Sequence, residues 1–370
     1  MKTIIILEDS RKVGFGGGQR GSIEVINALH KDFNCVATDS ILDSIFAKEA
    51  EIVLNKKAIK LYSLAAKNMG KASFSISFFE FLTYPFFALL NIIILCRNLR
   101  KNKLNKQNSI LYAPLKKTLI YAYILNLLTG IPFAYHARNV DNNKSMFFKI
   151  LRKILRKAFI VICVSKTVQE NLKLHNSIVL YDSVVLRNLT QFSKNIENKN
   201  IVVAAFASLI EWKGLEYLMQ SYGYLKNKNK IYIRIYGNGT QENYLKTLEN
   251  DHITLCGFAK NTESIMKNNV DIICVPSIDQ EAFGRVPVEG YCFGIPAIVT
   301  NIGAQAEITI DGKTGTHVPI KSAKKIAEAI DFLVENPQIY KQMSENSLEY
   351  VKQFDMEIFN KKINEIMERV

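Results

Sequence analysis

Short apolar runs alternate with segments of helical periodicity along the whole chain. The runs are rich in Ile, Val, Phe and Tyr, as expected for strands. They occupy residues 3–7, 35–38, 109–115, 133–137, 159–165 and 177–181 in the first half, and residues 201–207, 230–237, 253–258, 271–276, 297–300 and 316–320 in the second. Most are separated by helical patterns, of which residues 20–32 are the first. This alternation predicts α/β domains built on parallel sheets.

A polar stretch without apolar periodicity, residues 191–200, separates the two halves. A chain of 370 residues is too long for one ordinary core and suits two domains of roughly 150 to 200 residues each. We therefore expect an N-terminal domain at residues 1–190 and a C-terminal domain at residues 191–352. Residues 353–370 are helical in pattern and are expected to form a last helix.

The positive charge is concentrated in the first half. Residues 51–200 hold 24 Lys and Arg against 6 Asp and Glu, a net charge of +18. The whole chain carries +14, so the remaining residues together carry −4. This asymmetry predicts an anionic partner for the first half, either nucleic acid or a phospholipid surface.

An apolar and aromatic run at residues 74–96 precedes a basic cluster at residues 97–106. The longest piece without a charge, residues 81–96, contains Pro85 and Asn91 and is short for a bilayer core. Two interpretations stay open: an interfacial helix with Lys and Arg at the lipid headgroups, or a buried core helix followed by a solvated basic loop. No nucleic-acid-binding module is recognised. We therefore expect an anionic membrane surface, and no nucleic acid, as a partner.

The six cysteines are scattered, mostly within apolar runs, and form no CxxC pair. This pattern favours reduced thiols and a cytoplasmic protein, peripheral on the inner face of the cell membrane if the basic half binds lipid. The first residues read as a strand, because their apolar core is too short for a secretory signal. No His, Cys, Asp or Glu cluster has the spacing of a metal site. We expect neither a metal nor a cofactor.

The segment at residues 271–315 carries the most specific chemistry. Glu281 lies on a turn after a predicted strand, Glu289 follows eight residues later, and Pro287 suits the first turn of a helix. Gly294 and Pro296 end that helix before the next apolar run. A ligand here would meet a helix N-terminus, whose unpaired N–H groups and positive dipole end favour a diphosphate. A carboxylate such as Glu289 can accept two hydrogen bonds from a ribose diol.

Five motifs of the second half resemble the donor-binding half of the family 4 retaining glycosyltransferases, in that family's order and spacing. They are FASLIEWKGLEYLM, IYGNGT, ITLCGFAKN, the pair Glu281 and Glu289, and VTNIGAQAEITIDGKTG. The resemblance covers residues 200–340 well and the N-terminal half more loosely. In the first half, Gly17, Gly18 and Arg20 loosely match a family loop of two glycines, a variable residue, Glu and Arg. Gln19 stands near the place of the acid.

The resemblance implies the GT-B architecture: two Rossmann-like domains facing each other across a cleft, with the last helix crossing back to the N-terminal domain. Open α/β sheets bind ligands at the carboxyl ends of their strands. Under that rule the glycine loop at residues 16–18, His136, Lys213 and Glu281 are expected around one crevice.

Three residues are implied by the resemblance to be catalytic. His136, in FAYHARN, would hydrogen-bond to the transferred sugar. Lys213, in EWKG, would stabilise the charge that develops on the departing diphosphate. Glu281 would orient sugar hydroxyls and stabilise positive charge on the ring.

The donor-binding residues implied by the resemblance are Gly17, Gly18, Ser208, Gly237, Gly239, Phe283, Gly284, Arg285 and Glu289. Ser208 stands where the family usually has an Arg. Arg285 and Arg234 are two candidates to replace that cation. No metal ligand is implied.

The implied reaction moves a sugar, a hexose or N-acetylhexosamine, from a nucleotide diphosphate sugar to an acceptor hydroxyl with retention. The departing phosphate oxygen would take the acceptor proton, so no carboxylate nucleophile is needed, in contrast to hydrolases. The basic half suggests a lipid-linked or growing glycan as acceptor, as in bacterial-type assembly of lipopolysaccharide or capsule. Two other functions fit parts of the sequence: a GT-B-fold nucleotide-sugar epimerase and a non-catalytic peripheral membrane protein.

Overall fold

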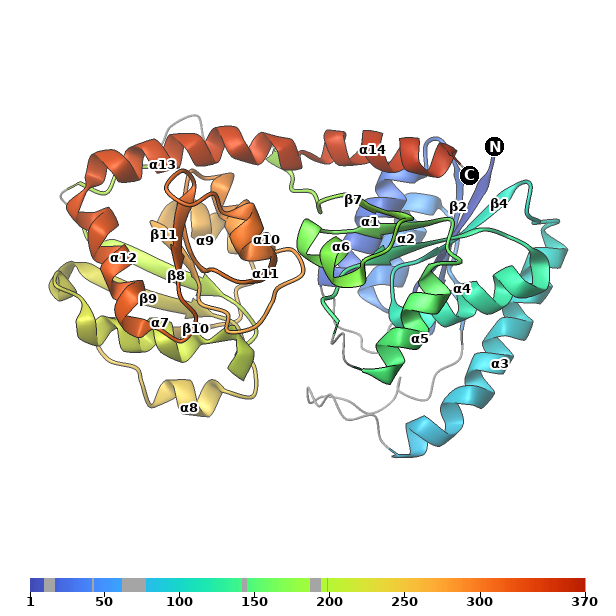
Figure 1. Ribbon diagram of the computed structural model, residues 1–370, viewed down its shortest axis with the longest axis horizontal. Coiled ribbons are helices and arrows are strands. Elements are labelled where there is room, and N and C mark those ends of the chain that lie inside the picture. Colours follow the sequence, from blue (N-terminus) through green and yellow to red (C-terminus); the bar gives the residue numbers. More distant parts are fainter. Residues whose placement is uncertain are drawn as a thin grey trace. The chain divides into compact units, whose positions relative to one another are not determined.

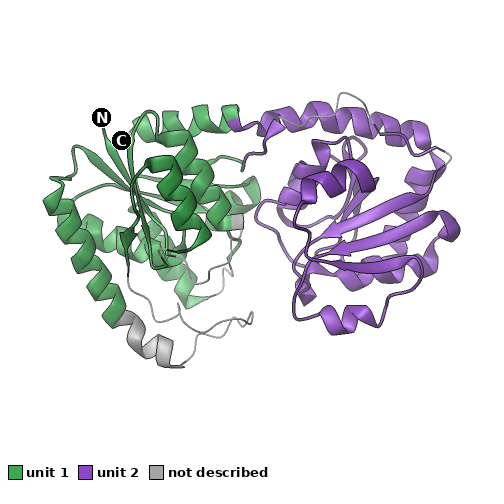
Figure 2. Ribbon diagram, turned by 180° about the vertical axis from the view of Figure 1, so that it is seen from behind, with its two compact units in different colours: residues 1–182, 357–370 green, residues 183–356 purple. Residues whose placement is uncertain are grey.

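The computed structural model describes residues 1–9, 17–41, 43–61, 78–141, 145–186, 194–197 and 199–369. The chain divides into two compact units, which Figure 2 colours separately. Unit 1 consists of Met1–Asp182 together with Glu357–Val370, and unit 2 consists of Ser183–Met356. The polar stretch at residues 191–200 belongs to unit 2, and four of its residues, 191–193 and 198, lie outside the described part.

Unit 1 is built on a seven-stranded parallel sheet with the order β3-β2-β1-β4-β5-β6-β7. The strands are β1 Thr3–Leu7, β2 Asn34–Asp39, β3 Ile59–Lys60, β4 Ser109–Ala113, β5 Phe133–Ala137, β6 Ile160–Cys163 and β7 Ser177–Val179. Every residue of β1, β4, β5 and β6 is buried, because helices cover both faces of the sheet. This double cover explains why these strands read as continuous apolar runs.

The helices of unit 1 lie on the two faces of this sheet. They are α1 Gly17–Leu29, α2 Ile45–Leu54, α3 Phe78–Lys101, α4 Lys116–Thr129, α5 Met146–Leu155, α6 Lys166–Leu172 and α14 Met356–Glu368. Helices α3, α4 and α5 lie together on one side of the sheet, and α14 lies on the other (Figure 1). Ser44 and Ser165 cap α2 and α6, since their hydroxyls accept the backbone N–H groups of Ala47 and Val168.

The last helix, α14, completes the core of unit 1. Its buried side chains, Phe359, Ile363, Ile366 and Met367, belong to the same core cluster as those of α1, α2 and β1. Asn364 also donates a hydrogen bond of 3.0 Å to the carbonyl oxygen of Ala28 at the end of α1. The chain therefore leaves unit 1, forms unit 2 and returns to unit 1, as the expected crossing of the last helix requires.

Unit 2 is built on a six-stranded parallel sheet with the order β10-β9-β8-β11-β12-β13. The strands are β8 Ile201–Phe206, β9 Ile231–Tyr236, β10 Ile253–Gly257, β11 Ile272–Val275, β12 Ala297–Thr300 and β13 Gly315–Val318. In both units the strand order reverses direction beside the first strand. Loops after the neighbouring strands β8 and β11 are therefore brought together at one edge of the sheet.

The helices of unit 2 are mostly short. They are α7 Leu215–Ser221, α8 Glu242–Lys246, α9 Thr262–Asn269, α10 Arg285–Tyr291, α11 Gly303–Ile308, α12 Ala323–Glu335 and α13 Pro337–Tyr350, with 3-10 turns at Glu211–Lys213, Tyr222–Tyr224, Lys228–Lys230 and Val351–Phe354. Tyr340 of α13 is buried, and its hydroxyl donates a hydrogen bond of 2.7 Å to the carbonyl oxygen of Asp271. This contact holds α13 against the start of β11.

The predicted fold class is confirmed: both units are parallel α/β sheets. Two local predictions need correction. The two-residue strand β3 was missed, because Ile59 and Lys60 are too few to show alternation. Helix α1 begins at Gly17 rather than near Arg20, so Gly17 and Gly18 form its first turn instead of a loop. The other glycines of that motif, at residues 14 and 16, lie outside the described residues.

Helix α3 contains most of the apolar run at residues 74–96; residues 74–77 lie outside the described part. Ala88, Ile92 and Leu95 of this helix are buried, whereas Phe86 and Leu89 are exposed. The helix thus packs one side on the core and shows apolar side chains on the other. None of the helices in the described part of the chain has the length and apolarity needed to cross a bilayer.

The packing of α14 makes a stability prediction. Replacing the buried Phe359 by Ala should lower the free energy of unfolding of unit 1 by about 3–5 kcal/mol, because the substitution removes apolar contacts and leaves a cavity. Ile358, the preceding residue, is 39% exposed, and Ile358→Ala should cost less than about 1 kcal/mol. Urea unfolding followed by circular dichroism compares the two variants. Equal losses would show that α14 is not part of this core.

Candidate functional site

Two charged side chains from neighbouring loops of unit 2 form a partly buried ion pair. Lys213 lies in the 3-10 turn that follows β8, and Glu281 lies in the loop that follows β11. These strands are parallel neighbours, so their following loops lie side by side. The Nζ atom of Lys213 lies 2.7 Å from Oε1 of Glu281, and the Ser277 hydroxyl donates a hydrogen bond of 2.6 Å to the same oxygen. Charge-assisted hydrogen bonds therefore join the two loops.

Two glycines allow these loops to pack closely. Gly214 has a φ of +60°, and a Cβ at this position would lie 2.3 Å from the carbonyl oxygen of Pro276. Gly303 has a φ of +66°, and a Cβ there would lie 2.7 Å from the backbone nitrogen of Glu281. Both the left-handed backbone and the close contact exclude a side chain. The backbones that carry Lys213 and Glu281 are thus each fixed by a glycine contact.

The ion pair lines a pocket of unit 2. Other parts of the lining come from the end of β8, the end of β11 and the first turn of α10, including Phe206, Pro276 and Gly284. Of the described residues that line this pocket, Lys213 is the only one with a cationic side chain. Lys213 is therefore the group of this pocket that can bind an anion, and the Glu281 carboxylate offsets its charge.

A second pocket adjoins the first at the end of β8. Phe206 lines both, and the second pocket continues over the ends of β9 and β10, where Ser208, Tyr236, Gly237 and Phe258 line it. The rings of Phe206 and Tyr236 are stacked, with 4.7 Å between centroids and 8° between planes. Apolar aromatic walls beside backbone polar groups suit a flat heterocyclic ligand. We refer to this second site as the aromatic pocket.

The loop that contains Gly237 and Gly239 is bound to the loop after β8. The backbone N–H of Leu209 donates to the carbonyl oxygen of Asn238 at 2.9 Å, and that of Gln241 donates to the carbonyl oxygen of Leu209 at 2.8 Å. Gly237 lines the aromatic pocket, whereas Gly239 lies against the Leu209 backbone. Gly237 is thus placed to touch a ligand, and Gly239 to support the loop.

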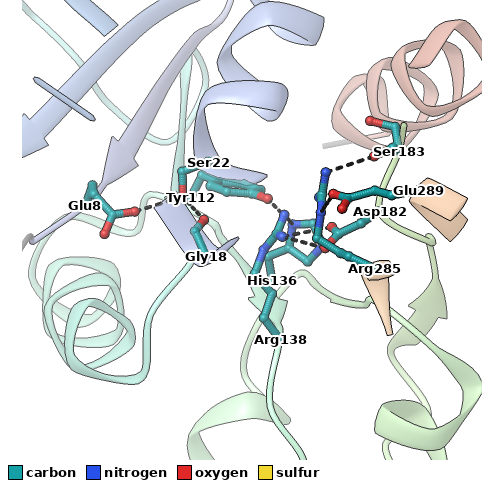
Figure 3. A network of polar contacts seen from close by, with 10 residues as sticks. All are labelled: Glu8, Gly18, Ser22, Tyr112, His136, Arg138, Asp182, Ser183, Arg285 and Glu289. Carbon is teal, nitrogen blue, oxygen red and sulfur yellow. Dashed lines mark hydrogen bonds and ion pairs between the residues drawn. The ribbon is translucent and has the colours of Figure 1, made fainter. Parts of the chain in front are cut away.

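Helix α10 starts at the pocket of the ion pair. Gly284 is its N-cap residue, and Pro287 lies in its first turn, as the sequence predicted. Nε of Arg285 donates a hydrogen bond of 3.5 Å to Oε1 of Glu289, one turn further along. The same guanidinium donates to the carbonyl oxygen of Ser183 at 3.3 Å (Figure 3). Arg285 therefore orients the Glu289 carboxylate.

One of the predicted donor residues and one candidate cation have other surroundings. Phe283 is buried and packs its ring edge-on against Phe354, so it supports the start of α10. Arg234 donates to the carbonyl oxygens of Ile233 and His252, and it is not among the residues that line the Lys213 pocket. The replacement of a family Arg by Ser208 is therefore not compensated by Arg234 in that pocket.

In unit 1, His136 lies at the centre of a buried polar network (Figure 3). It belongs to β5, and the hydroxyl of Tyr112 on the adjacent strand β4 is hydrogen-bonded to its Nδ1. Arg138 lies 3.3 Å from the same nitrogen and donates to both carboxylate oxygens of Asp182, at 2.8 and 3.0 Å. The network thus connects strands β4 and β5 with Asp182, which follows β7.

These contacts define the protonation state of His136. Arg138 can only donate hydrogen bonds, so the Nδ1 atom that faces it must carry a lone pair, to which the Tyr112 hydroxyl donates. Burial and the Arg138 charge lower the pKa of His136 well below its usual value. The imidazole is therefore neutral at pH 7, with its proton on Nε2. Among the described residues this buried Nε2 has no hydrogen-bond partner.

A buried carboxyl lies directly after β1. The Ser22 hydroxyl of α1 lies 2.8 Å from Oε2 of Glu8 and 3.2 Å from the carbonyl oxygen of Gly18. Burial raises the pKa of Glu8 to about 7; the hydrogen bond from Ser22 opposes the increase, and the carboxylates of Asp39 and Asp9 add to it. Glu8 therefore keeps its proton to a higher pH than an exposed carboxyl does.

Sequence reasoning missed four of these polar residues. Glu8, Asp182 and Ser277 each come directly after a predicted apolar run, and Glu281 was predicted from its place on the turn that follows such a run. The same rule could have identified them. Tyr112 lies inside an apolar run, and nothing in the sequence shows that its hydroxyl meets His136.

Residues 187–350 match the family model of glycosyl transferases group 1. This range contains both pockets, the Lys213–Glu281 pair and helix α10. This segment of the chain is therefore similar to the group 1 glycosyltransferases. The match ends just before the 3-10 turn that precedes α14, and it leaves all of unit 1 outside.

Curated relatives match the chain over part of their length. An uncharacterized glycosyltransferase of Methanocaldococcus jannaschii is 31% identical over 209 residues, which is 53% of this chain and 56% of the relative. The capsular polysaccharide biosynthesis glycosyltransferase CapM of Staphylococcus aureus is 25% identical over 162 residues, 42% of each chain. The matched segments thus span about half the length of these relatives.

Solved structures match the whole chain. The HepE protein of Anabaena in complex with UDP has a TM-score of 0.80 at 17% identity, and covers 100% of both chains. The lipopolysaccharide outer core galactosyltransferase WaaB has a TM-score of 0.75 at 15% identity, again over 100% of both chains. At such low identity the likeness concerns the fold, which is GT-B.

The raised pKa of Glu8 makes a prediction about pH. The unfolded chain has a Glu8 pKa near 4.5, so between about pH 4.5 and 7 the folded protein holds a proton that the unfolded chain releases. The stability contribution is complete below pH 4.5 and is lost as the pH rises through 7. Relative to Glu8→Gln, which keeps an acceptor for Ser22, the wild type should lose on the order of 3 kcal/mol between pH 5 and 8. Urea unfolding across this range measures the difference; parallel curves would contradict it.

Proposed function

We propose that this group 1 glycosyltransferase transfers a sugar, with retention, from a nucleotide diphosphate sugar to an acceptor hydroxyl. The observation that carries the proposal is the Lys213–Glu281 pair beside the aromatic pocket, within the segment that matches the family. A cation, a carboxylate and an aromatic wall correspond to the three parts of such a donor: diphosphate, sugar and base.

The donor is proposed to lie along the carboxyl ends of β8, β9 and β11. The base occupies the aromatic pocket, between Tyr236 and Phe258 and close to Ser208 and Gly237. The diphosphate reaches Lys213 in the adjoining pocket, since the two pockets meet at Phe206. The complex of HepE with UDP is a precedent for a uracil nucleotide in a protein of this fold.

Glu289 is proposed to bind the ribose of the donor. Its carboxylate lies on the second turn of α10 and is oriented by Arg285. A carboxylate can accept hydrogen bonds from both hydroxyls of a ribose diol, and such bonds to a charged group are stronger than neutral ones. Gly284 and Arg285 at the start of α10 remain proposed donor residues, and Gly17 and Gly18 at the start of α1 remain so in unit 1.

The chemical step requires stabilisation of the leaving diphosphate. As the bond to the anomeric carbon breaks, negative charge grows on the phosphate oxygen, and the ammonium of Lys213 stabilises it. The same oxygen then takes the proton of the acceptor hydroxyl, which attacks from the same face. Glu281 stabilises the positive charge on the ring and orients sugar hydroxyls. No covalent enzyme intermediate is formed.

In unit 1, His136 is proposed to donate a hydrogen bond to a hydroxyl of the bound sugar. Its contacts with Tyr112 and Arg138 leave the N–H on Nε2 and keep the ring neutral. A neutral donor suits a sugar hydroxyl, and it adds no positive charge close to the ring cation of the transition state.

The acceptor is proposed to be a lipid-linked or growing glycan in cell-surface polysaccharide assembly, at the cytoplasmic face of an anionic membrane. The relatives that support this include CapM of Staphylococcus aureus and a phosphatidyl-myo-inositol mannosyltransferase of Mycobacterium leprae, which is 24% identical over 162 residues. The net charge of +18 on residues 51–200 supports an anionic surface.

Donor binding tests the proposal directly. The chain has one Trp, Trp212, and the Nζ atom of Lys213 lies 4.2 Å from the centre of its ring. A nucleotide sugar whose diphosphate binds Lys213 should therefore change the Trp fluorescence and raise the melting temperature. Glu289→Ala should weaken that binding about tenfold by loss of the ribose contact.

A matched control comes from the same unit. Glu242 forms an i,i+4 ion pair with Lys246 on α8, as Glu289 does with Arg285 on α10. Glu242→Ala should leave donor affinity unchanged. If no nucleotide sugar stabilises the protein, or if both variants bind equally, the proposed donor site is wrong.

Removal of the Lys213 ammonium should affect the rate more than the affinity. Lys213→Met should lower kcat by roughly 10²–10³, the usual cost of losing one group that stabilises the leaving charge. Lys246→Met, on the exposed face of α8, serves as the control. Because Lys213→Met leaves Glu281 without its partner, unfolding of the variant is measured in parallel. A kcat within twofold of the wild type would contradict the role of Lys213.

A further inference from the structure

Helix α5 shows apolar side chains to the solvent. Met146, Phe147 and Ile150 are 74%, 54% and 52% exposed, respectively, and they follow one another at helical spacing on the side away from the sheet. The opposite side of the helix packs on the core through Phe148, Leu151 and Leu155, which are buried. The exposed residues therefore have no place in the core of unit 1 and require another explanation.

The same helix carries a row of positive charges. Lys149, Lys153 and Arg156 are exposed and lie beside the apolar residues on the outward side, and Lys157 follows. No Asp or Glu occurs anywhere in residues 145–169. This face is thus apolar along one strip and positive along the next, with no negative charge of its own segment to neutralise it.

Neighbouring helices extend the pattern on the same side of the sheet. Helices α3, α4 and α5 lie together on this side (Figure 1). Phe86 and Leu89 of α3 and Leu127 and Leu128 of α4 are also exposed. The other side of the sheet carries α14, where Ile358 is 39% exposed, and α2, where Ile45 and Ile52 are 41% and 80% exposed. These side chains are isoleucines without a neighbouring exposed aromatic residue on their helices. The apolar exposure is therefore concentrated on one face.

We propose that the outward face of α5, formed by Met146, Phe147, Ile150, Lys149, Lys153 and Arg156, docks on an anionic phospholipid bilayer. This inference depends on the proposed function in one respect: the proposed function places the acceptor at such a bilayer. It places the contact on a helix distinct from the run at residues 74–96 and from the basic cluster that follows it.

The chemistry of this face fits a bilayer surface better than a polar partner. A helix that lies in the interface buries its apolar strip among the acyl chains, while Lys and Arg reach the phosphates of the headgroups. Each basic residue near an anionic leaflet adds an attraction that salt screens. The phosphates of a nucleic acid would satisfy the charges but would leave Met146, Phe147 and Ile150 in water.

Vesicle flotation tests the proposal with the full chain. The vesicles consist of phosphatidylcholine alone, or of phosphatidylcholine with about one quarter phosphatidylglycerol. The wild type should bind the anionic vesicles and only weakly the neutral ones. Phe147→Ser with Ile150→Ser should weaken binding by about tenfold or more through lost apolar burial. Lys149→Gln with Lys153→Gln should weaken it several-fold at low salt and less at high salt.

Matched controls come from the opposite side of the same sheet. Ile52→Ser with Ile358→Ser removes two exposed apolar side chains from α2 and α14, and Lys361→Gln with Lys362→Gln removes two charges from α14. Both controls should bind vesicles as the wild type does. Donor binding, read from Trp212 fluorescence, should be unchanged in all four double variants, so a failed donor assay would affect the proposed function and not this surface. Unaltered flotation of the α5 variants, or equal losses in the controls, would overturn the proposal.

Discussion

The ion pair between Lys213 and Glu281 joins the two loops of unit 2 on which the proposed donor site depends. An ammonium that is mostly removed from water is costly unless an anion lies beside it, and the Glu281 carboxylate supplies that anion. The pair exists because β8 and β11 are parallel neighbours and because Gly214 and Gly303 let their loops approach. One pocket of unit 2 is lined by this pair, and the aromatic pocket adjoins it at Phe206, so the shape of the site follows from the order of the strands.

Unit 1 uses a different principle. Its buried network keeps His136 neutral by surrounding Nδ1 with donors, and the Arg138 charge is compensated by Asp182 rather than by the histidine. Glu8, also buried, has a pKa that moves toward neutral pH. Unit 2 thus contains an ion pair, that of Lys213 and Glu281. Unit 1 contains His136, which stays neutral, and Glu8, whose pKa is raised toward neutral pH.

The fold was largely predictable from the sequence, whereas the contacts of the site were not. Strands buried on both faces appear as continuous apolar runs, and Pro287, Gly294 and Pro296 mark the limits of the helix after Glu281. A two-residue strand such as β3 has too few positions to show a pattern. The hydrogen bond between Tyr112 and His136 depends on the register of β4 and β5. The hydrogen bond between Ser22 and Glu8 depends on where α1 begins, and the glycines at that point were interpreted as a loop. Register and packing are properties of the assembled sheet.

The return of α14 to unit 1 has a consequence for biosynthesis. Unit 2 is contiguous in the chain, so all its strands are available to fold as soon as they leave the ribosome. Unit 1 begins to emerge first, yet its core lacks Phe359, Ile363, Ile366 and Met367 until α14 has been translated. During synthesis the apolar surface that α14 covers stays open for the whole time that unit 2 takes to appear. The nascent polypeptide therefore offers a long-lived binding site for chaperones on the segment that is made earliest.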